Sequence, residues 1–364
     1  MNITKTTLLR YLIGTVVCAF SAQTISAEGT KLPYWKDIQT VAVNKEAPRT
    51  AFMSYDNSGQ ALTGKYENSP YYKLLNGKWN FYYVDAYKDL PANIEQPGAD
   101  ITWKEINVPG NWEVQGYGTA IYTNQPYDFQ PSNPQPPHLP EANPVGVYQR
   151  DIEIPSNWDG RDIYLRLEGA KSGVYVYLNG KEVGYSEDSK NPAEFLINKY
   201  LQPGKNSLVV KCFRYSTGSY LECQDFWRLS GIERDVFLFS QPKTAVQDFE
   251  VVSTLDDTYK NGIFKLDVNV TNHTAANKNV TVTYELLDAD KKVVTSAETP
   301  CNVSADGKNT VTFNASLNNV KTWTSEQPNL YKLLISLKIE RKISIFANQI
   351  QKHNFSLKIW QSLN

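Results

Sequence analysis

Short runs of strictly alternating apolar and polar side chains constrain the fold of this chain more than any other feature. In Ile163-Tyr-Leu-Arg-Leu-Glu168, the side chains of Ile163, Leu165 and Leu167 share one face and the intervening ones share the other. A period of two predicts a half-buried β-strand. No segment shows a helical repeat or an alternation of strands with helices. The sequence therefore predicts an all-β protein.

A tight hairpin is the clearest local prediction. The alternating run Val174-Tyr-Val-Tyr-Leu178 is followed by Asn179-Gly180 and then by Lys181-Glu-Val-Gly-Tyr185. Asn and Gly tolerate the positive φ angles that a two-residue hairpin turn requires. We expect the two runs to pair as antiparallel strands.

The strand pattern changes at Gln241-Pro242, where we place a domain boundary. Beyond it, alternating runs at 264–270, 280–286, 310–313 and 331–337 are separated by turns. About 100 residues of such strands are typical of an immunoglobulin-like β-sandwich, here expected over 242–338. Before the boundary, the stretch 130–144 contains six prolines and is predicted to be an extended surface loop.

Both ends of the chain differ in character from the middle. Residues 1–27 combine Lys5 and Arg10 with an apolar run and small residues at Ser26 and Ala27, which predicts a cleaved signal peptide and an exported, periplasmic or extracellular protein. No later apolar stretch is long enough to predict a membrane span. Residues 339–364 are basic and apolar without turn signals, and we expect them to be out-of-frame sequence after a frameshift or premature stop near Leu337.

Charge and reactive side chains exclude several classes of function. The chain has 37 Lys and Arg against 38 Asp and Glu, so its net charge of −1 predicts no nucleic-acid partner. With three histidines, a Ser/His/Asp triad is not expected. After the signal peptide, Cys212, Cys223 and Cys301 remain, an odd number without zinc-site spacing. Cys212 is expected to be a buried thiol, with a Cys212–Cys223 bridge left open.

Long motifs in the first part carry the functional information. They run from Val108 to Gly118, from Ala120 to Phe129, from Gly184 to Phe195 and from Gly218 to Asp235, and a further one from Trp323 to Tyr331 closes the second part. In this order they resemble the N-terminal part of a family 2 glycoside hydrolase of the β-galactosidase type. The resemblance covers about residues 37–337.

This resemblance implies a jelly-roll sugar-binding domain over 28–241, an immunoglobulin-like domain over 242–338 and then a (β/α)8 barrel with the catalytic carboxylates. By motif position, Asn124 resembles the asparagine that reaches the galactose subsite. Asp188 resembles the aspartate that binds galactose hydroxyls beside a monovalent cation. A divalent cation is implied for the barrel. An amide and a carboxylate suit this role because they hydrogen-bond neighbouring hydroxyls, but neither can perform hydrolysis. No catalytic residue is therefore predicted in this chain.

Taken without the resemblance, the same residues have plainer interpretations. Asn124 would be a turn residue, and Asp188 would cap the turn at Asn191-Pro192. A further charged cluster is interpreted as ion pairs and domain packing, since alternating charges beside a tryptophan in a strand-rich stretch usually pair with each other. It comprises Glu222, Asp225, Trp227, Arg228, Glu233 and Arg234.

The resemblance implies an enzyme that hydrolyses terminal non-reducing β-D-galactose residues in β-galactosides with retention. A barrel needs about 250 residues, which do not fit after residue 338, so we expect this chain alone to be inactive. A non-catalytic carbohydrate-binding module is the alternative from another class, and a structural or adhesive sandwich protein is a third. A glucuronidase or mannosidase is less favoured, because the motifs around Asn124 and Asp188 have the galactosidase form. A homo-oligomer of the full-length form is left open.

Overall fold

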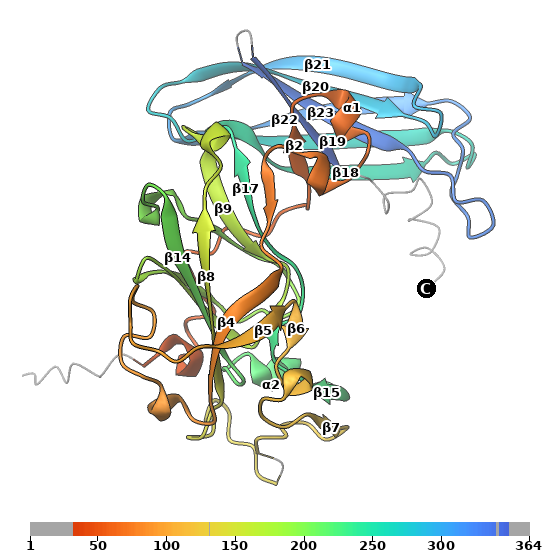
Figure 1. Cartoon of the computed structure of the whole chain (residues 1–364). Coiled ribbons are helices and arrows are strands. Elements are labelled where there is room, and N and C mark those ends of the chain that lie inside the picture. Colours follow the sequence, from red (N-terminus) through yellow and green to blue (C-terminus); the bar gives the residue numbers. More distant parts are fainter. Residues whose placement is uncertain (1–31, 131, 340–341, 349–364) are drawn as a thin grey trace, which may run out of the picture. The chain divides into compact units, whose positions relative to one another are not determined.

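The computed structural model describes residues 32–130, 132–339 and 342–348, and the described residues from Tyr34 onward belong to one compact unit. Strands dominate this part of the chain (Figure 1). The predicted all-β class, with two successive sandwiches, is confirmed. The expected signal peptide at 1–27 and residues 349–364 of the expected tail lie outside the described residues.

Two sheets build the first sandwich, which corresponds to the expected jelly roll. The larger has seven strands in the order β1 (Ala42–Val43), β12 (Lys181–Ser186), β11 (Gly173–Leu178), β14 (Lys205–Phe213), β8 (Val145–Glu153), β4 (Gly77–Val84), β5 (Lys104–Val108). The smaller has four strands in the order β13 (Ala193–Leu196), β9 (Asp162–Leu167), β17 (Val236–Gln241), β3 (Tyr72–Leu74).

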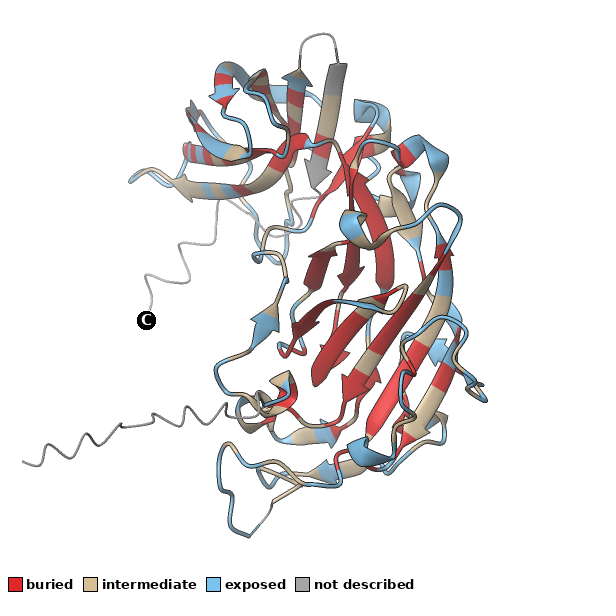
Figure 2. Ribbon diagram, turned by 90° about the vertical axis from the view of Figure 1, so that its left-hand side faces the viewer, coloured by how far each residue is buried: buried red, intermediate tan, exposed pale blue. Residues whose placement is uncertain are grey.

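One apolar core joins these two sheets. Trp79 and Val176 from the larger sheet belong to the same buried cluster as Leu165, Phe195 and Leu238 from the smaller one. Alternation along each strand supplies the inward-facing side chains, and their burial drives the two faces together. Figure 2 shows buried residues concentrated in these strands, with the connecting loops largely exposed.

The predicted hairpin is confirmed. Strands β11 and β12 pair antiparallel, with Leu178 opposite Lys181. Asn179 and Gly180 have φ angles of 53° and 75°, as a primed two-residue turn requires. The Asn179 side chain also donates to the carbonyl of Tyr200, which ties the turn to the neighbouring loop.

The half-buried prediction for residues 163–168 is wrong in one respect. Strand β9 forms as expected, but all its residues are buried, including those of the polar face. Tyr164 stacks on Phe239 at 4.9 Å between ring centroids, within an apolar cluster that also contains Met53 and Leu334. Segments from far along the chain therefore cover the face that alternation assigned to solvent.

Two small sheets and several short helices accompany the first sandwich. A three-stranded sheet runs in the order β10 (Ala170–Lys171), β16 (Gly231–Ile232), β6 (Gly110–Asn111), and a two-stranded sheet joins β15 (Phe226–Arg228) to β7 (Ile121–Thr123). The α-helices are α1 (Ser58–Ala61) and α2 (Ser219–Glu222). The 3-10 helices are Tyr34–Lys36, Tyr66–Asn68, Tyr87–Asp89, Glu113–Gln115, Ser156–Trp158 and Asn198–Tyr200. None of these helices is long and apolar enough to cross a membrane.

The second sandwich has one sheet of three strands, in the order β18 (Thr244–Leu255), β19 (Gly262–Asn272), β22 (Gly307–Leu317). Its other sheet has five, in the order β2 (Met53–Tyr55), β24 (Lys342–Asn348), β23 (Lys332–Ile339), β20 (Lys278–Leu287), β21 (Val293–Val303). Strand β2 comes from the segment between β1 and β3, which are both strands of the first sandwich. The expected domain limits stay predictions, although residues 342–348 form strand β24 within this sandwich.

Two further expectations concern a loop and the thiols. The described part of the proline-rich stretch, 132–144, contains neither helix nor strand, as predicted. Cys212 is a buried free thiol, as expected, and burial raises its pKa. Cys223 is also free, so the bridge between Cys212 and Cys223 is not formed.

Candidate functional site

Asp188 lies in the exposed loop that follows β12. Its carboxylate accepts hydrogen bonds from the side-chain amide of Asn191 at 2.8 Å and from the backbone N–H of Asn191 at 3.4 Å. This is the local turn that the plainer interpretation predicts. The side chain itself stays open to solvent. The loop thus exposes the Asp188 carboxylate to solvent, and hydrogen bonds to Asn191 of the same loop fix the position of this carboxylate.

The residues on either side of Asp188 anchor the loop to the segment around α2. Buried Glu187 accepts hydrogen bonds from the Tyr185 hydroxyl at 2.7 Å and from the Gly218 backbone N–H at 2.7 Å, and burial raises its pKa. Ser189 donates to Glu222 from its backbone N–H at 2.8 Å and from its hydroxyl at 2.5 Å. Asp188 is therefore held between two fixed neighbours.

Asn124 follows β7 directly and is exposed. Among the described residues, its side chain makes no hydrogen bond, so both the amide nitrogen and the amide oxygen are available to a ligand. The preceding Thr123 lies opposite Phe226 of β15. The backbone thus positions Asn124 at the end of β7, while its side-chain amide is not used in a structural hydrogen bond within the described structure.

Arg228 fixes the backbone beside Asn124. Its guanidinium donates to the carbonyl of Gln125 at 2.9 Å and also to the carbonyl of Gln224. It lies 3.6 Å from the carboxylate of Asp128, and both side chains are 3% exposed. This buried cation therefore links the loop after β7 to the segment before β15.

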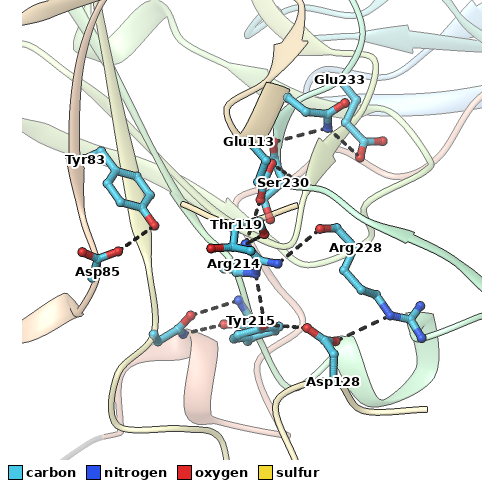
Figure 3. A network of polar contacts seen from close by, with 12 residues as sticks. Tyr83, Asp85, Glu113, Thr119, Asp128, Arg214, Tyr215, Arg228, Ser230 and Glu233 are labelled. Carbon is cyan, nitrogen blue, oxygen red and sulfur yellow. Dashed lines mark hydrogen bonds and ion pairs between the residues drawn. The ribbon is translucent and has the colours of Figure 1, made fainter. Parts of the chain in front are cut away.

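A wider polar network surrounds Arg228 (Figure 3). Tyr215 donates from its hydroxyl to Asp128 at 2.7 Å, and Arg214 donates to the carbonyl of Arg228 at 3.2 Å. Arg214 also pairs with Glu113 at 3.0 Å, and burial raises the pKa of Glu113. Buried charges are tolerated where they are paired, as Arg214 is with Glu113 and Arg228 with Asp128, although in the described structure the Nε atom of Arg228 and one carboxylate oxygen of Asp128 have no hydrogen-bond partner. The network makes the loop that carries Asn124 a rigid part of the sandwich.

The structure brings the two predicted residues into one group of loops without direct contact. The ammonium of Lys190, two residues after Asp188, lies 5.8 Å from the ring centroid of Phe226, which is opposite Thr123. Asp188 also borders a cavity of about 240 Å³ together with Lys45, Arg49 and Glu194. Asn124 does not line that cavity. Their predicted roles toward a sugar stay predictions.

The interpretation of the charged cluster at 222–234 is only partly correct. Its members do form structural contacts, but their partners lie elsewhere in the chain rather than within the cluster. Arg228 pairs with Asp128, Glu233 pairs with Lys190, and Glu222 binds Ser189. Trp227 is exposed rather than packed against another domain in the described structure. Sequence spacing contains no signal for these pairings, because the partners are up to 100 residues apart.

The predicted metal site consists of Asp188 alone. The described residues contain no group of three or more His, Cys, Asp or Glu side chains that could hold a metal ion. Asp188 and its neighbour Asn191 offer oxygen atoms, the donor type that hard cations prefer. The monovalent cation implied at Asp188 therefore stays a prediction, as does the divalent cation implied for the barrel.

Comparison with known proteins places these residues in a family. Residues 72–242 match the family model "Glycosyl hydrolases family 2, sugar binding domain", and residues 244–346 match the model "Glycosyl hydrolases family 2". Asn124, Asp188 and Arg228 all lie within the first match.

Relatives and solved structures agree with this match. The chain is 36% identical to a β-galactosidase of Priestia megaterium over 86% of its own length and 31% of the relative's. It is 34% identical to a β-galactosidase of Actinobacillus pleuropneumoniae, over 83% and 28%. It thus spans about 30% of the length of these curated relatives.

Among solved structures, a β-glucuronidase of Bacteroides uniformis is similar in fold, with a TM-score of 0.61 at 19% identity, over 74% of this chain and 30% of that one. A putative β-galactosidase from Bacteroides fragilis has a TM-score of 0.57 at 18% identity, over 76% and 40%. At these identities the likeness supports the fold only. The two family models, which match residues 72–242 and 244–346, show that this chain belongs to glycosyl hydrolase family 2.

Proposed function

We propose that this chain is the sugar-recognising N-terminal portion of an exported β-galactosidase. The complete enzyme would hydrolyse terminal non-reducing β-D-galactose residues in β-galactosides with retention of configuration. The observation that carries this proposal is the pair of exposed, rigidly mounted side chains, Asn124 and Asp188, in loops of the family's sugar-binding domain. The sequence relatives, which are β-galactosidases, support galactose as the sugar.

The two residues would form one wall of a galactose pocket. The carboxylate of Asp188 accepts hydrogen bonds from two neighbouring hydroxyls, and the amide of Asn124 both donates and accepts. Together these groups can distinguish an axial from an equatorial hydroxyl. Retaining hydrolysis needs two further carboxyl groups about 5–5.5 Å apart, which the family resemblance assigns to the barrel. A monovalent cation beside Asp188 would supply positive charge toward the sugar oxygens.

Calorimetric titration of the purified chain with methyl β-galactoside tests this proposal. Binding is expected to be weak and to fall at least about tenfold in Asp188→Ala and in Asn124→Ala, since each loses about one charge-assisted or neutral hydrogen bond. Methyl β-glucoside, which differs only at the axial hydroxyl, should bind less. Asp257→Ala, an exposed carboxylate in the second sandwich, is the matched control. Equal binding by all variants would reject the assignment.

Turnover of nitrophenyl β-galactoside separates recognition from catalysis. The chain alone is expected to release no nitrophenol above the buffer rate while still binding the galactoside. Turnover that disappears on substitution within this chain would contradict our view that the catalytic carboxylates lie outside it. Binding without turnover in every longer form of the protein would favour the non-catalytic carbohydrate-binding module instead.

Export is the remaining part of the proposal. The pattern of residues 1–27 supports cleavage after Ala27. Protein recovered from the periplasm or the medium is expected to begin at Glu28 on N-terminal sequencing. Recovery from the cytoplasm with Met1 intact would contradict it.

A further inference from the structure

An exposed aromatic pair lies on the small two-stranded sheet that carries Asn124. Tyr122 of β7 is directly opposite Trp227 of β15, and their ring centroids are 5.4 Å apart. Tyr122 is 63% exposed and Trp227 is 52% exposed. Figure 1 shows β7 and β15 side by side near α2. Two large rings in contact with each other and open to solvent form an apolar surface that is ready for a ligand.

The other face of this sheet is fixed by buried contacts. Arg228, the neighbour of Trp227 in β15, points the opposite way and is bound to Asp128 and to the carbonyls of Gln125 and Gln224. Because side chains alternate along a strand, Trp227 must then project outward. The aromatic pair is therefore mounted on a rigid base, and little conformational entropy is lost when a ligand binds it.

Asn124 lies directly beyond the end of β7, two positions after Tyr122. Two positions along a chain span at most about 7 Å. A sugar ring bound at Asn124 would thus have Tyr122 and Trp227 beside it. This distance suits the next ring of an oligosaccharide better than a second contact to the same ring.

We propose that Tyr122 and Trp227 form a subsite that stacks on the sugar attached to the galactose, and so select galactosides whose leaving group is a sugar ring. This inference rests on the proposed function. Tyr and Trp suit such a ligand because each offers an apolar face together with a polar edge. Tyr122 and Trp227 are the exposed aromatic side chains of this two-stranded sheet, and the exposed polar residues Asn124 and Gln125 follow β7 directly. A carbohydrate fits this aromatic pair better than the broad apolar patch that a protein partner would need.

The test compares galactose with lactose by calorimetric titration of the full chain. The wild type is expected to bind lactose about tenfold more tightly than galactose, the effect of one good stacking contact. Trp227→Ala should remove this advantage and leave galactose affinity unchanged, whereas Asn124→Ala should weaken both sugars. Trp323→Ala, which removes a partly exposed tryptophan of the second sandwich, is the matched control.

The outcomes separate the subsite from the proposed function. If galactose binds and Trp227→Ala leaves the ratio of the two affinities unchanged, the subsite is overturned and the galactose site stands. If the wild type binds neither sugar, both are overturned. Tyr122→Phe, which keeps the ring, should retain the lactose advantage, and its loss there would show that the hydroxyl rather than stacking is responsible.

Discussion

The ion pair between Arg214 and Glu113 is a deeply buried charge pair near the candidate site, as is that of Arg228 with Asp128. The Glu113 side chain is 0% exposed and that of Arg214 is 5% exposed. Glu113 also accepts the backbone N–H of Ser230 at 2.9 Å, and Arg214 donates to the carbonyl of Thr119 at 3.1 Å. These bonds connect three segments that are distant in sequence, so a single substitution tests the rigidity of the whole region.

Arg214→Met is expected to destabilise the chain by about 3–5 kcal/mol at pH 7, because it leaves the Glu113 carboxylate buried and unpaired. Burial already raises the pKa of Glu113 in the wild type, and loss of the cation raises it further. A carboxyl with a raised pKa binds its proton more tightly in the folded state. Stability is therefore lost as the pH rises from the ordinary carboxyl range through the raised pKa.

The defect of Arg214→Met should accordingly be smaller at pH 4 than at pH 7, as measured by urea unfolding at both values. The double variant Arg214→Met with Glu113→Gln should lose this difference, because no carboxyl is left to titrate. A defect of the same size at both pH values, or one that persists in the double variant, would show that Glu113 is not its source.

For single residues, the sequence predicted the exposed site residues better than the buried residues that hold their loops in place. Asn124 and Asp188 could be selected because they occupy long motifs, and the structure places both on the surface. Their loops approach each other where Lys190 lies near Phe226, the residue opposite Thr123. Arg228 was recognised as structural, but its partner Asp128 was not identified. A pairing across 100 residues depends on the fold and leaves no local pattern in the sequence.

Among the elements, β8 shows why close packing matters in the larger sheet. Gly146 lies in β8, and a Cβ atom added there would be 2.5 Å from the ring of Trp112 and 2.8 Å from that of Phe81. Both rings are buried and belong to the main core. The core has therefore no space for even one methyl group at this point.

Gly146→Ala is expected to lower the free energy of unfolding by about 1–3 kcal/mol through overpacking of these rings. Chemical denaturation measures the loss. Gly169→Ala is a suitable control, because its added Cβ would meet the flexible side chain of Arg234 at 3.3 Å and the carbonyl oxygen of Ser189 at 3.4 Å, both longer than the contacts at Gly146. Equal stability of the two variants would mean that the rings around Gly146 move apart easily.

Local elements were predictable where short-range chemistry decides them. The hairpin at Asn179-Gly180 formed as expected, since a turn depends on its own few residues. Strand β9 was located correctly, but its second face was wrongly assigned to solvent. The alternation of apolar and polar residues shows only how polar each face of a strand is. It cannot predict that residues distant in sequence, such as Met53 and Leu334, cover Tyr164.

In the molecule as a whole, the two sandwiches share more than a linker. A common apolar cluster contains Tyr164 and Phe239 of the first with Leu287 and Leu334 of the second. Asp162 of β9 contacts Lys243 at 3.0 Å and the Nδ1 atom of His273 at 2.7 Å. Shared burial of this kind makes the folding of two sandwiches cooperative.

Differential scanning calorimetry of the chain should therefore show one unfolding transition, with equal calorimetric and van't Hoff enthalpies. Asp162→Asn weakens the contacts to Lys243 and His273 and is expected to split or broaden this transition. Asp267→Asn, which removes a surface pair with Lys265 within the second sandwich, should leave it single. Two separate transitions in the wild type would show that the sandwiches unfold independently.

Strand β2 has a consequence for the order of events during synthesis. Among the described strands it pairs with β24 alone, with Met53 opposite Ala347 and Tyr55 opposite Ile345. Its partner thus leaves the ribosome about 290 residues later, which at about 5–20 residues per second is on the order of 15–60 s. During that interval β2 lacks the strand with which it pairs in the described structure. Strand β24 therefore joins β2 to the rest of the five-stranded sheet, and this sheet is complete only after residues 342–348 have been synthesised.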